Sequence, residues 1–541
     1  MDLLDDVRIL TSHLLTKSAE LALATNDDII KASVLIAFTY CSNFAELSSV
    51  LGQEVCEITQ KRVLGLIARI SEDAEDDTDG VLMEVLNNVI DCNTPGVPNN
   101  EIVQTEFSLV LKISAKDPAN IQIVVESQEC LEKLLENLDI DHYKNYVETW
   151  LPSFMKSIEG SAQTKYAYSP LLSLVLQFLT TFLKKKPTDY QLPTVMCNLT
   201  FEPLRQILLN SEDDETIQLA TEAFSYFLYN TDPTVVAPHL EAIVAILDRL
   251  LSFDVSDAAA MYVGSLIVTV FTRFSTEIEN MMPIILRAAA NRLIQAKHLS
   301  TSQNLLSVFC FLTSVDPRQT VDFLFGLHLD NTEHNALYSI VSIWLESFES
   351  IRGERRTKEN VIALIKLYLL HDKRLMEMQV NDEIIPYEGE QIITRSMAKK
   401  MPDRYSQVSV YTKIIKLFVA ELNFQDKQPD PERFITSDMA KEGNNGNSDN
   451  DTDSDGEWED VEDVLNYEKL KEYVDESDQD GEGSDSDDFF ASAIDEYSNA
   501  SVRDILVSFF KEVAANNTSG FRDIYNSLTE VEKKILSENL V

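Results

Sequence analysis

The amino-acid sequence predicts an all-α protein built as a solenoid, and three observations support this fold class. Glycine is scarce, with 15 residues among 541, which favours helices joined by short loops. Most of the first 370 residues place apolar side chains three and four positions apart, the period of an amphipathic helix. Pro152, Pro203, Pro238 and Pro283 are 51, 35 and 45 residues apart, close to the repeat of about 40 to 47 residues that is typical of HEAT and armadillo arrays. The sequence therefore predicts a HEAT-repeat superhelical solenoid.

Each expected repeat is a pair of helices. The first helices of four repeats are expected at 146–160, 201–210, 236–253 and 281–295. Each of these begins near one of the four prolines, because a missing N–H costs nothing in a first helical turn. Second helices are expected at 213–230 and 257–274. One unit cannot bury its apolar face alone, so neighbouring units must stack, and we expect the HEAT-repeat array to occupy residues 1–390.

The last third of the chain has a different composition. Residues 391–423 are expected to form a basic linker, with "TRSMAKKMPDR" at 394–404, and then a further helix of the array. Residues 424–452 have low apolar content and rising Asn, Gly, Ser and Asp, and the acidic tract that follows includes one stretch, 461–476, that could form a short amphipathic helix, so 424–490 are expected to be an acidic, largely disordered insertion. Helical periodicity returns in residues 491–541, which predict C-terminal helices. The acidic region is thus expected to have folded structure on both sides.

The formal net charge of −45 is unevenly placed along the chain. The segment from Asp449 to Asp488 holds 19 acidic residues against Lys469 and Lys471, a net charge of −17 in 40 residues that leaves −28 for the other 501. Contacts with nucleic-acid phosphates need clustered Lys and Arg, so this charge argues against direct binding of nucleic acid. A basic protein is the expected partner.

The acidic insertion also contains a tryptophan, which would add contact area and specificity to charge attraction. The alternative is that Trp458 packs back on the solenoid and the acids only solvate the chain. The expected partner-binding site consists of Asp451, Asp453, Asp455, Glu457, Trp458, Glu459, Asp460, Glu462, Asp463, Asp485, Asp487 and Asp488. A second acidic run at 71–80 predicts either a solvated turn or a second acidic contact made by Glu72, Asp73, Glu75, Asp76, Asp77 and Asp79.

Other classes of function find no support in the sequence. There is no G-x-x-x-x-G-K-[ST] loop, no G-x-G-x-x-G and no H-E-x-x-H, and the seven His are scattered singly, so we expect no enzyme and no cofactor. The six cysteines form no C-x-x-C pair and no metal-ligand grouping, which predicts buried thiols in a reducing compartment. The acidic N-terminus, and the lack of any apolar run near ~18 residues, predict a soluble intracellular protein without membrane insertion.

Three stretches of the last part of the chain carry a resemblance to a known family. They are "TRSMAKKMPDRYSQVSVYTKIIKLFVAEL", the insertion with "DGEWEDVED", and the final "FRDIYNSLTEVEKKILSENLV". In this order they resemble the C-terminal half of an importin-9 type nuclear import receptor of the karyopherin-β (importin-β) family. The resemblance implies a HEAT-repeat superhelix that carries cargo through the nuclear pore by weak contacts with Phe-Gly nucleoporins. It also implies control by the GTPase Ran and shuttling between cytoplasm and nucleus.

The resemblance further implies the kind of cargo. Members of this branch import core histone dimers, which they shield from premature contact with DNA, and in fungi they import the TATA-binding protein. The acidic insertion would then screen the basic cargo, and the main Ran site would lie in repeats that precede this half of the receptor. Other interpretations stay open, namely a HEAT-repeat scaffold for a phosphatase or similar complex, a histone chaperone that acts without transport, and an export receptor.

Overall fold

The computed structural model describes most of the chain in two compact units. It describes residues 10, 14, 17, 18, 20–25, 34, 53–73, 79–93, 99–136, 138–187, 190–329, 335–385, 404–427 and 500–540. The first unit runs from Met1 to Met282 and the second from Pro283 to Val541. Each unit is described by itself below.

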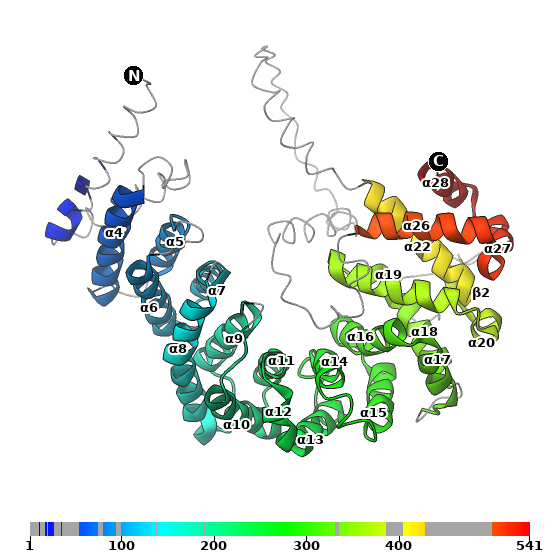
Figure 1. Ribbon diagram of the computed structural model, residues 1–541, viewed down its shortest axis with the longest axis horizontal. Coiled ribbons are helices and arrows are strands. Elements are labelled where there is room, and N and C mark those ends of the chain that lie inside the picture. The colour runs from blue at the N-terminus through cyan, green and yellow to red at the C-terminus, as the bar shows by residue number, and fades with distance from the viewer. Residues whose placement is uncertain are drawn as a thin grey trace, which may run out of the picture. The chain divides into compact units, whose positions relative to one another are not determined.

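The described part of the first unit consists of helices joined by short loops (Figure 1). The helices are α4 (Gln53–Asp73), α5 (Asp79–Ile90), α6 (Asn100–Lys116), α7 (Ile121–Glu136), α8 (Ile140–Gly160), α9 (Pro170–Lys184), α10 (Thr194–Asn210), α11 (Asp214–Asn230), α12 (Pro233–Val236), α13 (Leu240–Leu251) and α14 (Val263–Arg273). Two 3-10 turns, η2 (Ser161–Thr164) and η3 (Ala237–His239), follow α8 and α12.

These helices form two layers, as a HEAT array requires. The second helices of successive pairs, α5, α7, α9, α11 and α14, each pack against the next, and among the first helices α4 packs on α6, α8 on α10, and α10 on α13 (Figure 1). Each helix buries one face against its partner and others against the neighbouring pairs. The prediction of a helical HEAT-repeat solenoid is therefore confirmed for this unit.

Hydrogen bonds between neighbouring repeats show the repeat length directly. Arg249 in the last turn of α13 donates to the carbonyl oxygens of Leu208 and Ser211 at the end of α10, 41 and 38 residues earlier. Arg273 at the end of α14 donates to the Thr231 carbonyl oxygen, 42 residues earlier, at 2.7 Å. The last carbonyls of a helix have no partner within it, so a cation from the next repeat satisfies both their hydrogen bonding and their partial negative charge.

Two of the four prolines lie elsewhere than predicted. Pro152 lies inside α8 and Pro203 inside α10, so the expectation that both stand in a first helical turn is wrong. Helix α8 begins earlier because the Asp139 side chain caps it, accepting a hydrogen bond from the His142 N–H at 2.9 Å. Pro283 is the second residue of its helix, as predicted, and Pro238 lies in η3 just before α13.

The described part of the second unit is also mostly helical and ends in a cluster of helices. Its helices are α15 (Met282–Gln295, which begins at the unit boundary), α16 (Leu299–Val315), α17 (Pro317–Gly326), α18 (Ala336–Ser347), α19 (Glu354–Leu369), α20 (Lys373–Glu377), α22 (Val410–Lys427), α26 (Val502–Asn516), α27 (Phe521–Ser527) and α28 (Glu530–Asn539). The 3-10 turns η4 (Phe348–Ser350) and η8 (Thr518–Gly520) complete this part of the chain.

A small antiparallel sheet interrupts the helices of the second unit. Strand β1 (Gln379–Ile384) pairs with β2 (Tyr405–Ser409), with Val380 opposite Val408 and an irregularity after Asn381. The all-α expectation did not include this sheet. Helix α22 also begins only after β2 and extends to Lys427, so residues 424–427 are helical rather than part of the acidic insertion.

Candidate functional site

The acidic site predicted in the insertion lies outside the described residues. This applies to Asp451, Asp453, Asp455, Glu457, Trp458, Glu459, Asp460, Glu462, Asp463, Asp485, Asp487 and Asp488. The structure does describe the two helices that flank the insertion, α22 before it and α26 after it. The structure therefore shows only where the insertion is attached, at the end of α22 and at the start of α26.

The two ends of the acidic insertion are held together. Asp426, in the last turn of α22, accepts a hydrogen bond from Arg503 Nε at 2.7 Å, although the two residues are 77 positions apart. Asn539 of α28 donates to the other carboxylate oxygen of Asp426 at 2.5 Å and accepts from Arg503 Nη2 at 2.7 Å. We call these three residues the anchor. Because they join α22, α26 and α28, the chain leaves and re-enters the folded unit at one place.

An aromatic core lies beneath the anchor. The Phe509 ring of α26 meets the rings of Tyr368 on α19 and Phe418 on α22 edge to face, at 5.4 Å in both cases. The Tyr368 hydroxyl donates to the carbonyl oxygen of Thr518 at 3.1 Å. Contacts of this kind stabilise a pair of rings by roughly 0.5–1.5 kcal/mol beyond the area that they bury. The helix after the insertion is therefore packed firmly against the helix before it.

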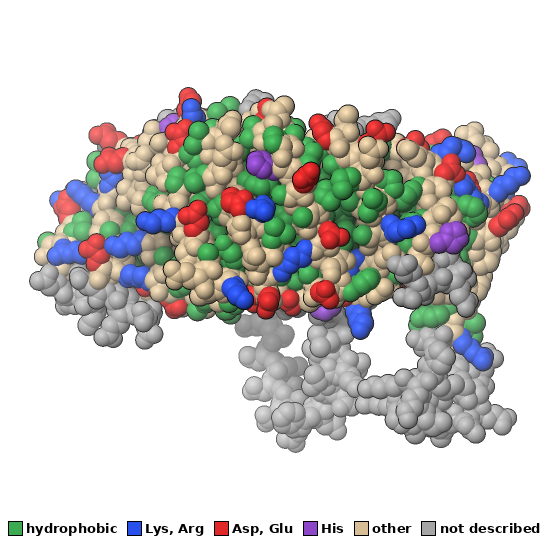
Figure 2. Space-filling model, turned by 90° about the horizontal axis from the view of Figure 1, so that it is seen from below, with side chains coloured by type: hydrophobic (Ala, Val, Ile, Leu, Met, Phe, Trp, Pro, Cys, Tyr) green, Lys and Arg blue, Asp and Glu red, His purple; other side chains and the backbone are tan. Residues whose placement is uncertain are grey.

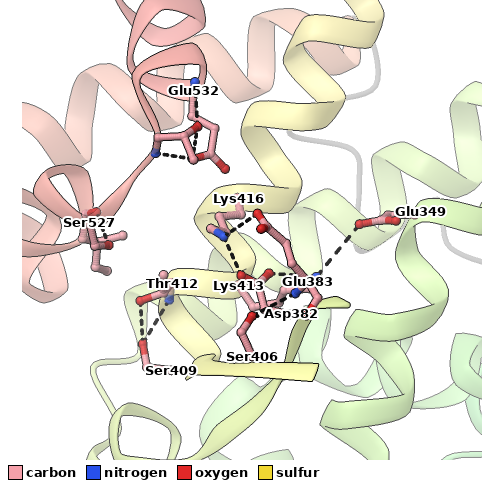
Figure 3. A network of polar contacts seen from close by, with 12 residues as sticks. Glu349, Asp382, Glu383, Ser406, Ser409, Thr412, Lys413, Lys416, Ser527 and Glu532 are labelled. Carbon is pink, nitrogen blue, oxygen red and sulfur yellow. Dashed lines mark hydrogen bonds and ion pairs between the residues drawn. The ribbon is translucent and has the colours of Figure 1, made fainter. Parts of the chain in front are cut away.

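A buried ion-pair cluster holds the other end of α22 (Figure 3). Asp382 of β1, whose side chain is only 4% exposed, lies 3.2 Å from Lys413 Nζ and 2.5 Å from Lys416 Nζ. Lys416 also pairs with Glu383 at 3.3 Å, and Lys413 lies 4.0 Å from Glu349. Burial opposes the charged form of Lys416, but the hydrogen bond and charge of Asp382 outweigh it and raise its pKa.

The base of the basic linker is fixed by the same strand pair. The Ile385 N–H donates to the Arg404 carbonyl oxygen at 2.7 Å, which closes the strands around the intervening residues. Residues 386–403, which include most of the predicted basic stretch, lie outside the described residues. Helix α22 has 18 residues and is therefore about 27 Å long, with the basic linker attached near its start and the acidic insertion at its end.

The second predicted acidic contact divides into three parts. Glu72 is exposed at the end of α4 and pairs with Lys112 at 3.1 Å, and Asp73 is the last residue of that helix. Glu75, Asp76 and Asp77 lie outside the described residues. Asp79 is buried, with its side chain 1% exposed and 3.5 Å from Lys116 Nζ, so it is not available to a partner at the surface. The acidic run thus combines the buried carboxylate of Asp79 with the exposed one of Glu72.

The sequence interpretation missed the anchor and the ion-pair cluster. It did not single out Asp382, Glu383, Lys413 or Lys416. Their only signal is the spacing of the two lysines, three apart, which places both on one side of α22. Nothing in the sequence points from Asp426 to Arg503.

The described residues contain no arrangement typical of a metal centre. No group of three or more His, Cys, Asp or Glu side chains lies close enough to hold a metal ion in the described ranges. The five cysteines that the structure describes are free and buried, as predicted, at positions Cys56, Cys92, Cys130, Cys197 and Cys310. In the same part of the chain, no helix combines the length and hydropathy needed to cross a membrane.

Comparison with known proteins gives relatives but no family model. No family model matches the chain. Importin subunit beta-5 of Saccharomyces cerevisiae is 55% identical over 543 residues, which are 100% of this chain and 53% of that protein. Importin subunit beta-5 of Schizosaccharomyces pombe is 23% identical over 67% of this chain and 36% of its own length. Importin-9 of Drosophila melanogaster is 21% identical over 57% of this chain and 30% of its own length.

These matches agree with the resemblance seen in the sequence. The chain spans about half the length of the Saccharomyces cerevisiae relative and about a third of the other two. The alignment that gives the identity of 55% covers the whole chain. The chain is therefore a homologue of importin subunit beta-5 and is related to importin-9.

Proposed function

We propose that this chain is part of a nuclear import receptor that binds strongly basic proteins and carries them through the nuclear pore. Its homology to proteins named as importins supports the transport role. Core histone dimers and the TATA-binding protein are the expected cargoes, Phe-Gly nucleoporins the expected contacts in the pore, and Ran the expected regulator. The receptor would shuttle between cytoplasm and nucleus.

The observation that carries the proposal is the anchored acidic insertion. A segment with 19 acidic residues and a net charge of −17 is attached at both ends to one place on the folded unit, where Asp426 meets Arg503. Figure 2 shows, by contrast, acidic and basic side chains interspersed with hydrophobic ones over the described part of one face. A terminal tail could bind a basic protein anywhere, whereas a segment fixed at both ends keeps its charge beside the same helices.

The acidic residues and Trp458 would have different tasks in cargo binding. The carboxylates between Asp451 and Asp488 would neutralise the cationic surface with which the cargo binds DNA. This attraction weakens with salt, because exposed charges are screened over about 10 Å at 0.1 M ionic strength. Trp458 would add apolar contact that salt does not weaken. Glu72, Asp73, Glu75, Asp76 and Asp77 would form a second contact, from which the buried Asp79 is left out.

The proposal is tested by the affinity of the purified chain for a core histone dimer across a salt series. The comparison is with a chain that lacks residues 449–488, and with a control that keeps this length but has Asn and Gln in place of its acids. Both changes should lower the affinity at low salt and flatten its dependence on salt. A histone affinity that neither change alters at any salt concentration would show that the insertion is not a cargo site.

A second measurement separates transport from the alternatives. A histone chaperone that acts without transport should bind the histone dimer but ignore immobilised Phe-Gly repeats. A HEAT-repeat scaffold should bind neither, and its partner binding should survive deletion of the insertion. An import receptor should bind Phe-Gly repeats and histones together.

A further inference from the structure

Two neighbouring helices of the first unit, α5 and α7, form one continuous face (Figure 1). At its start, Gly80 lies so close to α7 that a Cβ atom there would stand 3.2 Å from Gln122 Oε1. Further along, the Asn87 side chain donates to Glu126 Oε2 at 3.1 Å, and Lys133 of α7 donates to Asp91 at 3.0 Å. Contacts at three levels fix the two helices side by side.

One end of this face exposes apolar side chains. Ile121 and Val125, four residues apart on the same side of α7, are 80% and 59% exposed. Val81, the residue after Gly80 on the neighbouring helix α5, is 46% exposed. Single exposed apolar residues are ordinary, but Ile121 and Val125 stand one turn apart on one side of α7, and with Val81 they offer apolar surface that a partner can cover.

The same face carries acids, most of them towards its other end. Six carboxylates stand along the two helices and just after α5, against one ammonium, that of Lys133, which gives a formal charge of −5: Glu84, Asp91, Glu126, Glu129, Glu132 and Glu136. Lys133 is already paired with Asp91 at 2.8 Å and with Glu129 at 2.9 Å. Lys185, after α9, lies 3.9 Å from Glu136.

The charges of α7 gather towards its C-terminal end. That end of a helix carries a partial negative charge, so stability favours cations there, and Lys133 in the last turn suits this. Glu136 lies in the same turn and Glu132 just before it, whereas the first turn holds no acid. Burial opposes the charge of Glu129, but hydrogen bonds from Asn87 and Lys133 outweigh it and lower its pKa, so this carboxylate stays ionised.

We propose that the α5/α7 face binds a basic amphipathic helix of the cargo, an inference that rests on the proposed function. The apolar side chains of that helix would cover Val81, Ile121 and Val125, while its cations would meet the carboxylates further along. Ile121 and Glu136 are 15 residues apart, about 22 Å along the axis, so the face fits a helical segment of about 15 residues. This site would be separate from the acidic insertion, which belongs to the other unit.

The test uses the full chain and a core histone dimer as the probe. The apolar variant carries Ile121→Ser with Val125→Ser, and the acidic variant carries Glu84→Gln with Glu132→Gln. The apolar variant should lose roughly tenfold in affinity at every salt concentration, as for residues at the centre of an interface. The acidic variant should lose affinity at low salt and regain parity as salt rises.

Matched controls carry the same chemical changes elsewhere in the same unit. Val195→Ser alters a side chain that is 71% exposed on α10, and Glu241→Gln alters an exposed acid on α13, and both should leave the affinity unchanged. Thermal unfolding of every variant would show that the exposed substitutions leave the fold intact.

The outcomes separate this inference from the proposed function. If the apolar and acidic variants match their controls while deletion of residues 449–488 still weakens binding, the α5/α7 face is not a cargo site and the proposed function stands. If the unaltered chain does not bind the histone dimer, both fail. A photo-crosslinking residue at Val125 that captures histone, while one at Val195 does not, would support the inference directly.

Discussion

The buried ion-pair cluster of Asp382 offers the sharpest test of how helix α22 is held. Replacing Asp382 by Asn keeps the size of the side chain and its capacity to accept a hydrogen bond but removes its charge. Lys413 and Lys416, whose side chains are only 11% and 15% exposed, then lose their shared counter-charge. Removing one partner of a buried pair costs about 3–5 kcal/mol, because the other charge is left uncompensated.

The remaining partners reduce this cost only in part. Glu383 and Glu349 stay within 3.3 Å and 4.0 Å of the two lysines, but their side chains are 73% and 66% exposed, so water screens them. We therefore expect Asp382→Asn to destabilise the junction of β1 with α22 by about 3 kcal/mol, which is roughly a hundredfold in its opening equilibrium. Hydrogen exchange of the amides in the first half of α22 measures this opening.

A matched control and the pH dependence make the test specific. Asp322→Asn removes a carboxylate that is 58% exposed and lies 2.6 Å from Arg374. The opening free energy that amide exchange measures should therefore fall by no more than about 1 kcal/mol. Since the pKa of Lys416 is raised above its ordinary value of 10.5, the cluster contributes fully below that pH and is lost as pH rises through the higher value in the fold. If the amides in the first half of α22 exchange no faster in Asp382→Asn than in Asp322→Asn at neutral pH, our account of the cluster is wrong.

Three further predictions concern other parts of the chain. Arg503→Glu sets a like charge against Asp426, so the first turn of α26 should show faster amide exchange while the core of that helix stays protected. Burial raises the pKa of Glu106 to about 7, above the 4.5 of the unfolded chain, because the fold favours the protonated carboxyl. The stability that this protonated carboxyl contributes is therefore complete below pH 4.5 and lost as pH rises through 7. Urea unfolding should therefore find Glu106→Gln more stable than the natural chain at pH 8 by about 1–3 kcal/mol, with no difference at pH 4.5. Pro152→Ala restores a backbone N–H to the interior of α8 and should raise the free energy of unfolding by about 1–3 kcal/mol, whereas a decrease would show that the proline is needed for packing.

Much of the helical array could be predicted from sequence because its rules are local. Apolar residues three and four apart fix the faces of helices such as α13, where Ile243, Ile246, Leu247 and Leu250 are all fully buried or nearly so. The prolines were a weaker signal than they looked. Pro152 lies in mid-helix because a cap at Asp139 starts α8 well before it. The side chain of an N-cap residue accepts a hydrogen bond from an N–H only two or three residues later, so a proline further along the helix does not show where the helix begins.

The functional residues depend on contacts that no local pattern contains. Asp382 of β1 meets lysines 31 and 34 residues later in the chain, and the anchor joins residues 77 apart. Composition identified the acidic run at 71–80 but could not show that Asp79 turns inward to Lys116 while Glu72 faces solvent. Charge counts predict the partner class, whereas the fold decides which charges a partner can reach.

The central claim is that the acidic insertion acts as a cargo site because it is attached at both ends to the folded chain. The most direct test adds residues 449–488 as a separate peptide, at equal concentration, to the chain that lacks them and measures affinity for a core histone dimer. A tether supplies an effective concentration on the order of mM, so the account predicts that the separate peptide at micromolar concentration restores none of the lost affinity. Full restoration by the free peptide, or no loss on deletion, would contradict it.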